Sequence, residues 1–218
     1  MMFSAKNEFT RSPVSHAALA WLLAVLMVCG ALSGCKSVAR QSPLPPDAKV
    51  LAFGDSLTFG TGVLPEEGYP AVLQSLINRE VINAGVPGET TTEGLKRLPI
   101  WLNEYEPKLL VLCHGANDLL RSLSEEKAAD NLRAMVRMAR DRGIDVLLIA
   151  VPKFGAMRSP PTFYEDIATE FDIPIEKNTL DDIVRKRTLR SDTVHPNAEG
   201  YRLLAQAVAK RLQKSGAL

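Results

Sequence analysis

Three residues in this sequence have the types and the spacing that nucleophilic chemistry needs: a serine, a histidine and an aspartate. Ser56 follows a short apolar run and stands in the turn GDS at residues 54–56. A serine hydroxyl is a weak nucleophile and needs an adjacent base to remove its proton. By itself, such a turn is typical of a serine that caps a helix or closes a turn. The sequence must therefore supply a base elsewhere.

The candidate base follows from the small number of histidines. Of the three, His16 lies in an N-terminal segment that we expect to be removed, which leaves His114 and His195. His195 follows Asp192 by three residues, and at that spacing in a turn a carboxylate can orient the imidazole and stabilise its protonated form. The alternative is that Asp192 caps a turn and His195 caps the last helix. His114 has no acidic neighbour before Asp118, so we assign it to the wall of the site or to packing.

The elements that position these residues alternate between short apolar runs and longer segments of helical periodicity. Strands are predicted at residues 50–53, 81–83, 109–113 and 146–151, with a weaker one at 173–175. Helices are predicted at residues 69–78, 91–102, 125–142 and 197–214. This alternation indicates an α/β fold with a parallel sheet of about five strands, covered by helices on both faces. In such sheets, ligands bind beyond the carboxyl ends of the strands.

Two segments that follow predicted strands could stabilise the oxyanion of a tetrahedral intermediate. Acyl transfer needs hydrogen-bond donors there, usually backbone N–H groups and a side-chain amide. Residues 83–88, NAGVPG, contain glycines that permit a close approach of the backbone to a ligand, and residues 115–118, GAND, place an amide at the same edge. Each segment alone is also typical of an ordinary turn.

Taken together, these segments resemble the four sequence blocks of the GDSL or SGNH hydrolase family over nearly the whole domain. The blocks contain Ser56 in GDSLTFG, Gly85 in NAGVPGE, Asn117 in GAND and His195 in DTVHP. The resemblance implies a flavodoxin-like three-layer α/β/α fold and a catalytic triad of Ser56, Asp192 and His195. It also implies an oxyanion hole made by the N–H groups of Ser56 and Gly85 and by the amide of Asn117.

Within that family, the sequence looks closest to bacterial thioesterase I, lysophospholipase and arylesterase-like members. This implies a serine esterase that hydrolyses small acyl esters through an acyl-Ser56 intermediate, without a metal or an organic cofactor. The chain departs from the family at His114 and at the Pro-Pro pair of residues 160–161, which leaves the acyl-chain length and the leaving group open. One alternative is an O-acetyl esterase acting on cell-wall or polysaccharide sugars. Another is a surface binding module without catalysis, although every expected catalytic position holds a competent residue.

The N-terminus has the pattern of a lipoprotein signal peptide. Lys6 and Arg11 precede an apolar run at residues 17–32, and the motif LSGC at 32–35 resembles a lipobox in which Cys35 becomes acylated. The alternative is an uncleaved transmembrane anchor, for which the run is slightly shorter than the ~20 residues that span a bilayer. We therefore expect a lipid-anchored protein of the bacterial cell envelope, with its domain outside the cytoplasm.

This pattern predicts three parts: a signal peptide over residues 1–34, a lipidated Cys35 with a Pro-rich tether to residue 47, and a hydrolase domain over residues 48–218. An extended tether of this length could hold the domain roughly 35 Å from the lipid. Cys29 would leave with the signal, so Cys113 would remain alone in the domain, as a buried apolar residue and without a disulfide partner.

Charge excludes one class of function. The formal net charge is +1, and the basic residues are scattered without a stripe, so we expect no nucleic-acid partner. The sequence leaves the oligomeric state undetermined.

Overall fold

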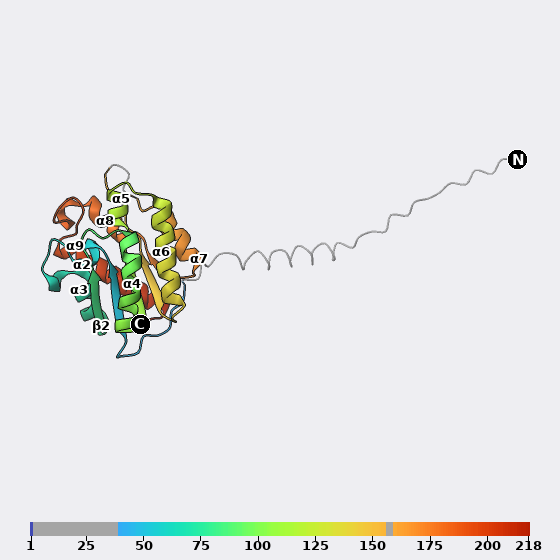
Figure 1. Ribbon diagram of the computed structural model, residues 1–218, viewed down its shortest axis with the longest axis horizontal. Helices are drawn as coiled ribbons and strands as arrows, with labels where there is room; N and C mark the ends of the chain where they lie inside the picture. The colour runs from blue at the N-terminus through green and yellow to red at the C-terminus, as the bar shows by residue number, and fades with distance from the viewer. Residues whose placement is uncertain (2–38, 156–158) are drawn as a thin grey trace. The chain divides into compact units, whose positions relative to one another are not determined.

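The computed structural model describes Met1 and residues 39–155 and 159–218 (Figure 1). The chain divides into the units Met1–Ser37 and Val38–Leu218, and all the described helices and strands belong to the second. The predicted signal segment and Cys35 lie outside the described residues. Among the residues that are described, no helix is both long and apolar enough to cross a membrane.

A five-stranded parallel sheet forms the centre of the domain, as the sequence predicted. The strands are β1 (Lys49–Gly54), β2 (Glu80–Gly85), β3 (Leu109–Cys113), β4 (Asp145–Ile149) and β5 (Ile175–Glu176). Their order in the sheet is β2-β1-β3-β4-β5, and every neighbouring pair is parallel. The order changes direction after β2, so β1 and β3 lie side by side where ligands bind in open α/β sheets.

Helices cover both faces of the sheet. They are α2 (Ser56–Phe59), α3 (Tyr69–Ile77), α4 (Thr91–Tyr105), α5 (Ala116–Leu120), α6 (Glu125–Arg140), α7 (Phe163–Glu170), α8 (Thr179–Arg185) and α9 (Ala198–Ser215). Right-handed crossovers place α4, α6 and α7 on one face and α3 on the other, where α9 packs against it (Figure 1). The four long helices were predicted to within a few residues, whereas α2, α5, α7 and α8 were not, because each has at most eight residues.

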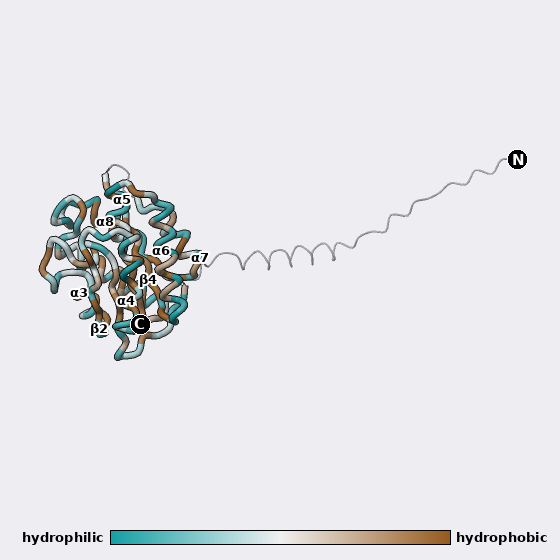
Figure 2. Tube along the Cα trace, in the orientation of Figure 1, coloured by the Kyte–Doolittle hydropathy of each residue, from teal (hydrophilic) through white to brown (hydrophobic). Residues whose placement is uncertain are grey.

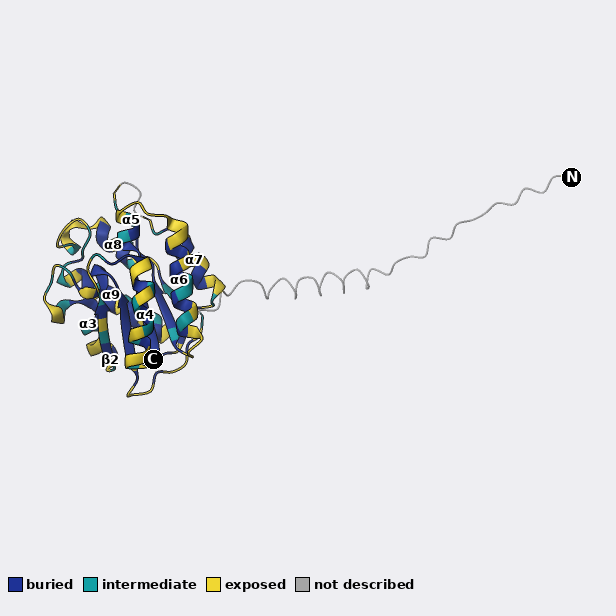
Figure 3. Cartoon of the chain, viewed as in Figure 1, coloured by how far each residue is buried: buried dark blue, intermediate teal, exposed yellow. Residues whose placement is uncertain are grey.

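The strands form the hydrophobic core. Residues 50–53 of β1 and all of β3 have no exposed surface, and these strands read as continuous apolar runs because helices bury them on both sides. Figure 2 shows the apolar colouring concentrated along the strands, and Figure 3 shows exposed residues on the outer helix surfaces. Cys113 is fully buried at the end of β3, as predicted, and burial raises the pKa of its thiol.

The predicted tether is shorter than the sequence indicated. Residues 41–44 pack against the domain rather than extending away from it. The Gln41 side chain donates to the Val146 carbonyl at 3.1 Å, and the Gln41 and Leu44 N–H groups donate to the carbonyls of Ser215 and Ala217, each at 2.9 Å. Leu44 is 7% exposed within the core. The apolar Leu44 and the hydrogen bonds offset the entropy lost on docking, so the prolines do not produce an extended spacer here.

Candidate functional site

Packing at the end of β1 holds Ser56 at the carboxyl edge of the sheet. A side chain at Gly54 would overlap the carbonyl of Cys113, so only glycine lets β1 and β3 approach this closely. Asp55 caps α2 by accepting from the N–H of Leu57 at 3.1 Å, which makes Ser56 the first residue of the helix and not its cap. The Ser56 N–H therefore belongs to the helix N-terminus, where N–H groups lack partners within the helix.

The three residues singled out from the sequence form one hydrogen-bonded chain. His195 Nε2 lies 2.9 Å from Ser56 Oγ, and His195 Nδ1 lies 2.7 Å from Asp192 Oδ2. Because the carboxylate can only accept, Nδ1 carries the proton, and Nε2 is left to accept from the serine hydroxyl. Ser56 and His195 are 139 residues apart in sequence, so only the fold brings them together. This geometry can activate a serine hydroxyl as a nucleophile.

Asp192 both caps its own turn and holds the imidazole, so the two interpretations of this residue are compatible. Its Oδ1 accepts from the N–H groups of Val194 and His195, each at 2.7 Å. Burial alone would raise the pKa of Asp192, but the hydrogen bonds from His195 and from the backbone outweigh it and lower that pKa. The carboxylate therefore stays ionised beside His195. The N-cap of α9 is Asn197, which accepts from Gly200 N–H at 3.0 Å, and not His195.

Of the predicted oxyanion donors, Asn117 is positioned by a contact that the sequence did not reveal. Its Nδ2 donates to the backbone carbonyl of Glu89 at 3.0 Å. An amide nitrogen has two N–H groups, so this bond orients the side chain and leaves the second N–H available.

The N–H of Gly85 is not available for the role that the resemblance implied. It donates to Asn83 Oδ1 at 3.0 Å, and Gly85 ends β2 in register with Gly54. A side chain at Gly85 would overlap the backbone of Phe59. Gly85 is therefore needed for close packing of β2 against α2.

Gly88, three residues later in the same turn, provides another candidate N–H donor. Within the described part of the chain, it has no hydrogen-bond partner, and Gly88 has a φ of 81°, a conformation that favours glycine. Gly88 immediately precedes Glu89, whose carbonyl holds the Asn117 amide. Two potential oxyanion donors therefore depend on the placement of one short segment.

A buried charge network anchors that segment, and sequence reasoning missed it. Glu89 Oε1 accepts from Arg97 Nε at 2.7 Å, while Glu89 Oε2 accepts from Arg97 Nη2 at 2.6 Å and lies 3.1 Å from His114 Nε2. The Gly115 N–H donates to His114 Nδ1 at 3.0 Å, so Nε2 carries the proton and donates to Glu89. His114 is fully buried, so of the two roles expected for it, the wall of the site or packing, the structure supports packing. The Arg97 guanidinium also lies 4.1 Å from the ring centre of Phe53.

Glu89 is ionised in this network. Burial raises its pKa, but the hydrogen bonds from Arg97 and His114 outweigh burial and hold that pKa below its usual value. An acidic residue directly after the predicted GVPG turn was the available signal. The sequence could not show that Arg97 and His114 would converge on it.

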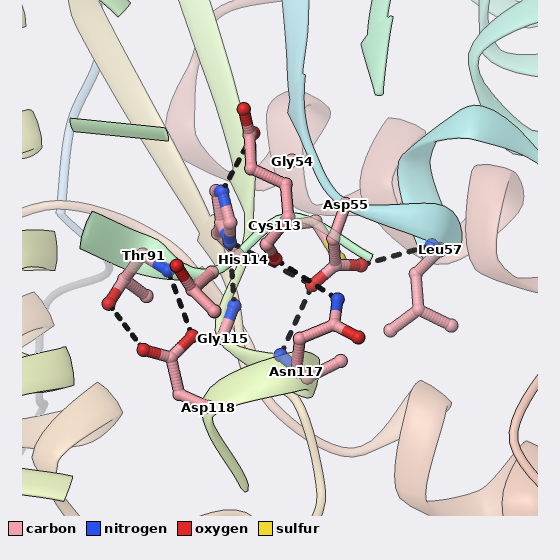
Figure 4. A network of polar contacts seen from close by, with 12 residues as sticks. Gly54, Asp55, Leu57, Thr91, Cys113, His114, Gly115, Asn117 and Asp118 are labelled. Atoms are coloured by element: carbon pink, nitrogen blue, oxygen red, sulfur yellow. Dashed lines mark hydrogen bonds and ion pairs between the residues drawn. The ribbon is translucent and has the colours of Figure 1, made fainter. Parts of the chain in front are cut away.

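Two further carboxylates join the loops that carry the site (Figure 4). Besides capping α2, Asp55 accepts from the N–H of Ala116 at 3.1 Å and so links the turn after β1 to the turn after β3. Asp118 accepts from the hydroxyl and the N–H of Thr91, at 2.7 and 2.8 Å, and so fixes α5 to the start of α4. Burial raises the pKa of Asp55, against the opposing effects of His114 and the two backbone N–H groups. Across the described residues, no group of three or more His, Cys, Asp or Glu side chains could hold a metal ion.

Comparisons with known proteins agree with this geometry. Residues 52–203 match the GDSL-like Lipase/Acylhydrolase family. The chain is 29% identical over 191 residues to an arylesterase of Vibrio mimicus, covering 83% of this chain and 94% of that protein. It is 29% identical over 172 residues to thioesterase 1/protease 1/lysophospholipase L1 of Escherichia coli K12, covering 75% of this chain and 83% of that protein.

A solved structure supports the same grouping. The psychrotrophic esterase EstA of a Pseudoalteromonas species superposes with a TM-score of 0.68 at 27% identity, covering 77% of this chain and 98% of that one. This chain belongs to the GDSL-like lipase/acylhydrolase family and is a serine ester hydrolase with the α/β fold of that group.

Proposed function

We propose that Ser56, His195 and Asp192 hydrolyse a carboxylic ester through an acyl-Ser56 intermediate. The observation that carries this proposal is the continuous hydrogen-bonded chain from Asp192 through His195 to Ser56, with distances of 2.7 and 2.9 Å. His195 accepts the hydroxyl proton as Ser56 Oγ attacks the carbonyl carbon. The protonated imidazole then gives that proton to the departing alcohol. A water molecule, deprotonated by His195, finally attacks the acyl carbonyl carbon. The protonated imidazole returns that proton to Ser56 Oγ as the bond to the acyl group breaks, and the carboxylic acid leaves.

The oxyanion formed in both steps is stabilised by the N–H groups of Ser56 and Gly88 and by the amide of Asn117. We place Gly88 in this role instead of Gly85, because the Gly85 N–H already donates to Asn83 and the Gly88 N–H has no partner among the described residues. Donors that are held in place before the reaction stabilise developing charge without a reorganisation cost. The hydrogen bond from Asn117 to the Glu89 carbonyl holds the side-chain donor in place before the reaction.

Substitution of the nucleophile tests the proposal. Ser56→Ala should reduce hydrolysis of p-nitrophenyl butyrate to background, while circular dichroism and the melting temperature remain close to those of the wild type. A fluorophosphonate probe should label the wild-type protein and leave Ser56→Ala unlabelled. The Pseudoalteromonas neighbour was crystallised inhibited by monoethylphosphonate, which makes this reagent class suitable. Hydrolysis by Ser56→Ala at the wild-type rate would refute the assignment.

The substrates that we propose are acyl esters of the kinds that the relatives' names describe, namely aryl esters, thioesters and lysophospholipids. The pocket beside the site, described below, supports an apolar acyl or alcohol group. A chain-length series of p-nitrophenyl esters, measured beside a lysophospholipid and an acetylated glycan, ranks these substrates. Acetate release from the glycan, without activity on longer acyl esters, would contradict this choice.

We also propose that Cys35 is lipidated and that the domain is held at a bacterial membrane outside the cytoplasm. The LSGC motif at residues 32–35, after a basic and then an apolar segment, supports this proposal. Because residues 41–44 dock on the domain, only five residues, 36–40, would separate it from a lipidated Cys35. Cells fed radiolabelled palmitate should label the wild-type protein but not Cys35→Ser. Equal labelling of both proteins would exclude this anchor.

A further inference from the structure

A pocket lies beside the loop that carries Asp192 and His195, and no step of the proposed mechanism uses it. It has a volume of about 360 Å³, and Leu120, Lys153, Phe154, Arg190, Thr193 and Val194 are among the residues that line it. Small-molecule sites have volumes of roughly 300–1,000 Å³. Thr193 and Val194 separate Asp192 from His195, and Leu120 ends the helix that contains Asn117. The pocket therefore borders the groups that surround the reacting carbonyl.

Among the residues that the structure describes, Lys153 and Arg190 are the cations that line this pocket, and of these two only Lys153 has an ion-pair partner. Lys153 Nζ pairs with Glu125 at 2.6 Å. Arg190 forms no ion pair with any residue that the structure describes. Its Nη1 donates to the Thr193 carbonyl at a long 3.4 Å, and its Nε is buried with no partner in the described structure. A guanidinium has five N–H donors, so Arg190 retains donors for another group.

On the other side of Arg190, the surface holds a second arginine and one carboxylate. Arg187, Arg190 and Asp192 line a neighbouring depression. Arg187 likewise forms no ion pair in the described part of the chain. Asp192 forms no ion pair with either arginine in the described structure, and its two oxygens are engaged by His195 and by N–H groups of its own turn. Arg185, by contrast, is bound by Asp181 at 2.9 Å.

We propose that Arg190, together with Arg187, binds an anionic group of the substrate, a phosphate or a carboxylate. This inference rests on the proposed function and narrows its substrate class to esters that carry a negative charge near the scissile bond. The planar guanidinium suits both anions, because two parallel N–H groups can donate to two oxygens at once. Leu120, Phe154 and Val194 contact the apolar part of the same substrate. A lysophospholipid headgroup and a half-ester of a dicarboxylic acid are two sources of this chemistry.

Paired substrates test the proposal. One pair is an octanoyl lysophosphatidic acid and monooctanoylglycerol, and the other is p-nitrophenyl hemisuccinate and p-nitrophenyl butyrate. Arg190→Gln should lower kcat/KM at least about tenfold for an anionic member, because hydrogen bonds to charged groups are the stronger ones, and should change the neutral member less than about twofold. A selective loss on the phosphate pair identifies the headgroup, and one on the carboxylate pair identifies the half-ester.

Two further variants separate recognition from structure. Arg185→Gln removes a nearby arginine that is already bound by Asp181, and should leave all four substrates unaffected. Arg190→Lys keeps the charge without the planar fork, and should retain part of the selectivity. An equal loss on charged and neutral esters would assign Arg190 to the stability of the loop and overturn the proposal, as would an unchanged ratio. Failure of the esterase mechanism itself would appear separately, as neutral-ester hydrolysis that survives Ser56→Ala.

Discussion

Replacing Glu89 by glutamine should destabilise the domain, because it removes the centre of the buried network. The Glu89 carboxylate accepts three hydrogen bonds, two from Arg97 and one from His114. Glutamine has one acceptor oxygen, and its NH₂ group would face an N–H donor of Arg97 or His114. At least one buried donor would lose its partner, and the Arg97 charge would lose its counter-ion.

The size of this destabilisation follows from the burial of the Glu89–Arg97 ion pair. Removing one partner of a buried ion pair costs about 3–5 kcal/mol. The side chains of Glu89 and Arg97 are 7% and 19% exposed, so water can partly solvate the arginine, and the lower end of that range applies. We therefore expect the free energy of unfolding to fall by about 3 kcal/mol. For a domain of this size, that corresponds to a decrease in melting temperature of about 6–12 °C.

Urea unfolding followed by circular dichroism measures this change, with Glu165→Gln as the matched control. Glu165 pairs with Lys177 at 2.9 Å, but both side chains are largely exposed, and such pairs contribute about 0–1 kcal/mol. Glu89→Gln should also lower kcat on a neutral ester, because Gly88 and the partner of Asn117 would shift. A free energy of unfolding within about 0.5 kcal/mol of the wild type would refute the argument that this network stabilises the fold.

In steady-state assays, Asn117→Ala should reduce kcat by about 10²–10³, as loss of one oxyanion donor does, with a smaller effect on KM. A decrease in kcat of less than about threefold would show that Asn117 is not an oxyanion donor. Because the pKa of Glu89 is lowered in the folded state, its contribution to stability is complete above its unfolded pKa of about 4.3 and is lost as pH falls through the folded pKa. Between pH 6 and pH 3, urea unfolding should therefore show a steeper loss of stability for the wild type than for Glu89→Gln. Burial raises the pKa of Cys113, so iodoacetamide should modify it only after unfolding, and rapid modification of the native protein would contradict the packing described here.

Elements with a local sequence signal were predicted, whereas features that depend on non-local contacts were not. The apolar runs of β1 and β3 and the periodicity of α4, α6 and α9 are local, so the sequence predicted them closely. The fifth strand was predicted at residues 173–175 and lies at Ile175–Glu176, because a two-residue edge strand has little pattern of its own. The docked segment at residues 41–44 was missed because prolines report a backbone preference and not the contacts that override it.

The site divides in the same way. By itself, the sequence determined the chemical types and the order of Ser56, Asn117, Asp192 and His195, because each stands in a short motif next to a strand or a helix. Only the tertiary structure decided how the segment of Gly88 is held, since Glu89 joins it to Arg97 and His114, whereas the bond that engages the Gly85 N–H is a local one to Asn83. Hydrogen-bond partners depend on the distances between atoms after the chain has folded. Composition and spacing along the chain do not contain those distances.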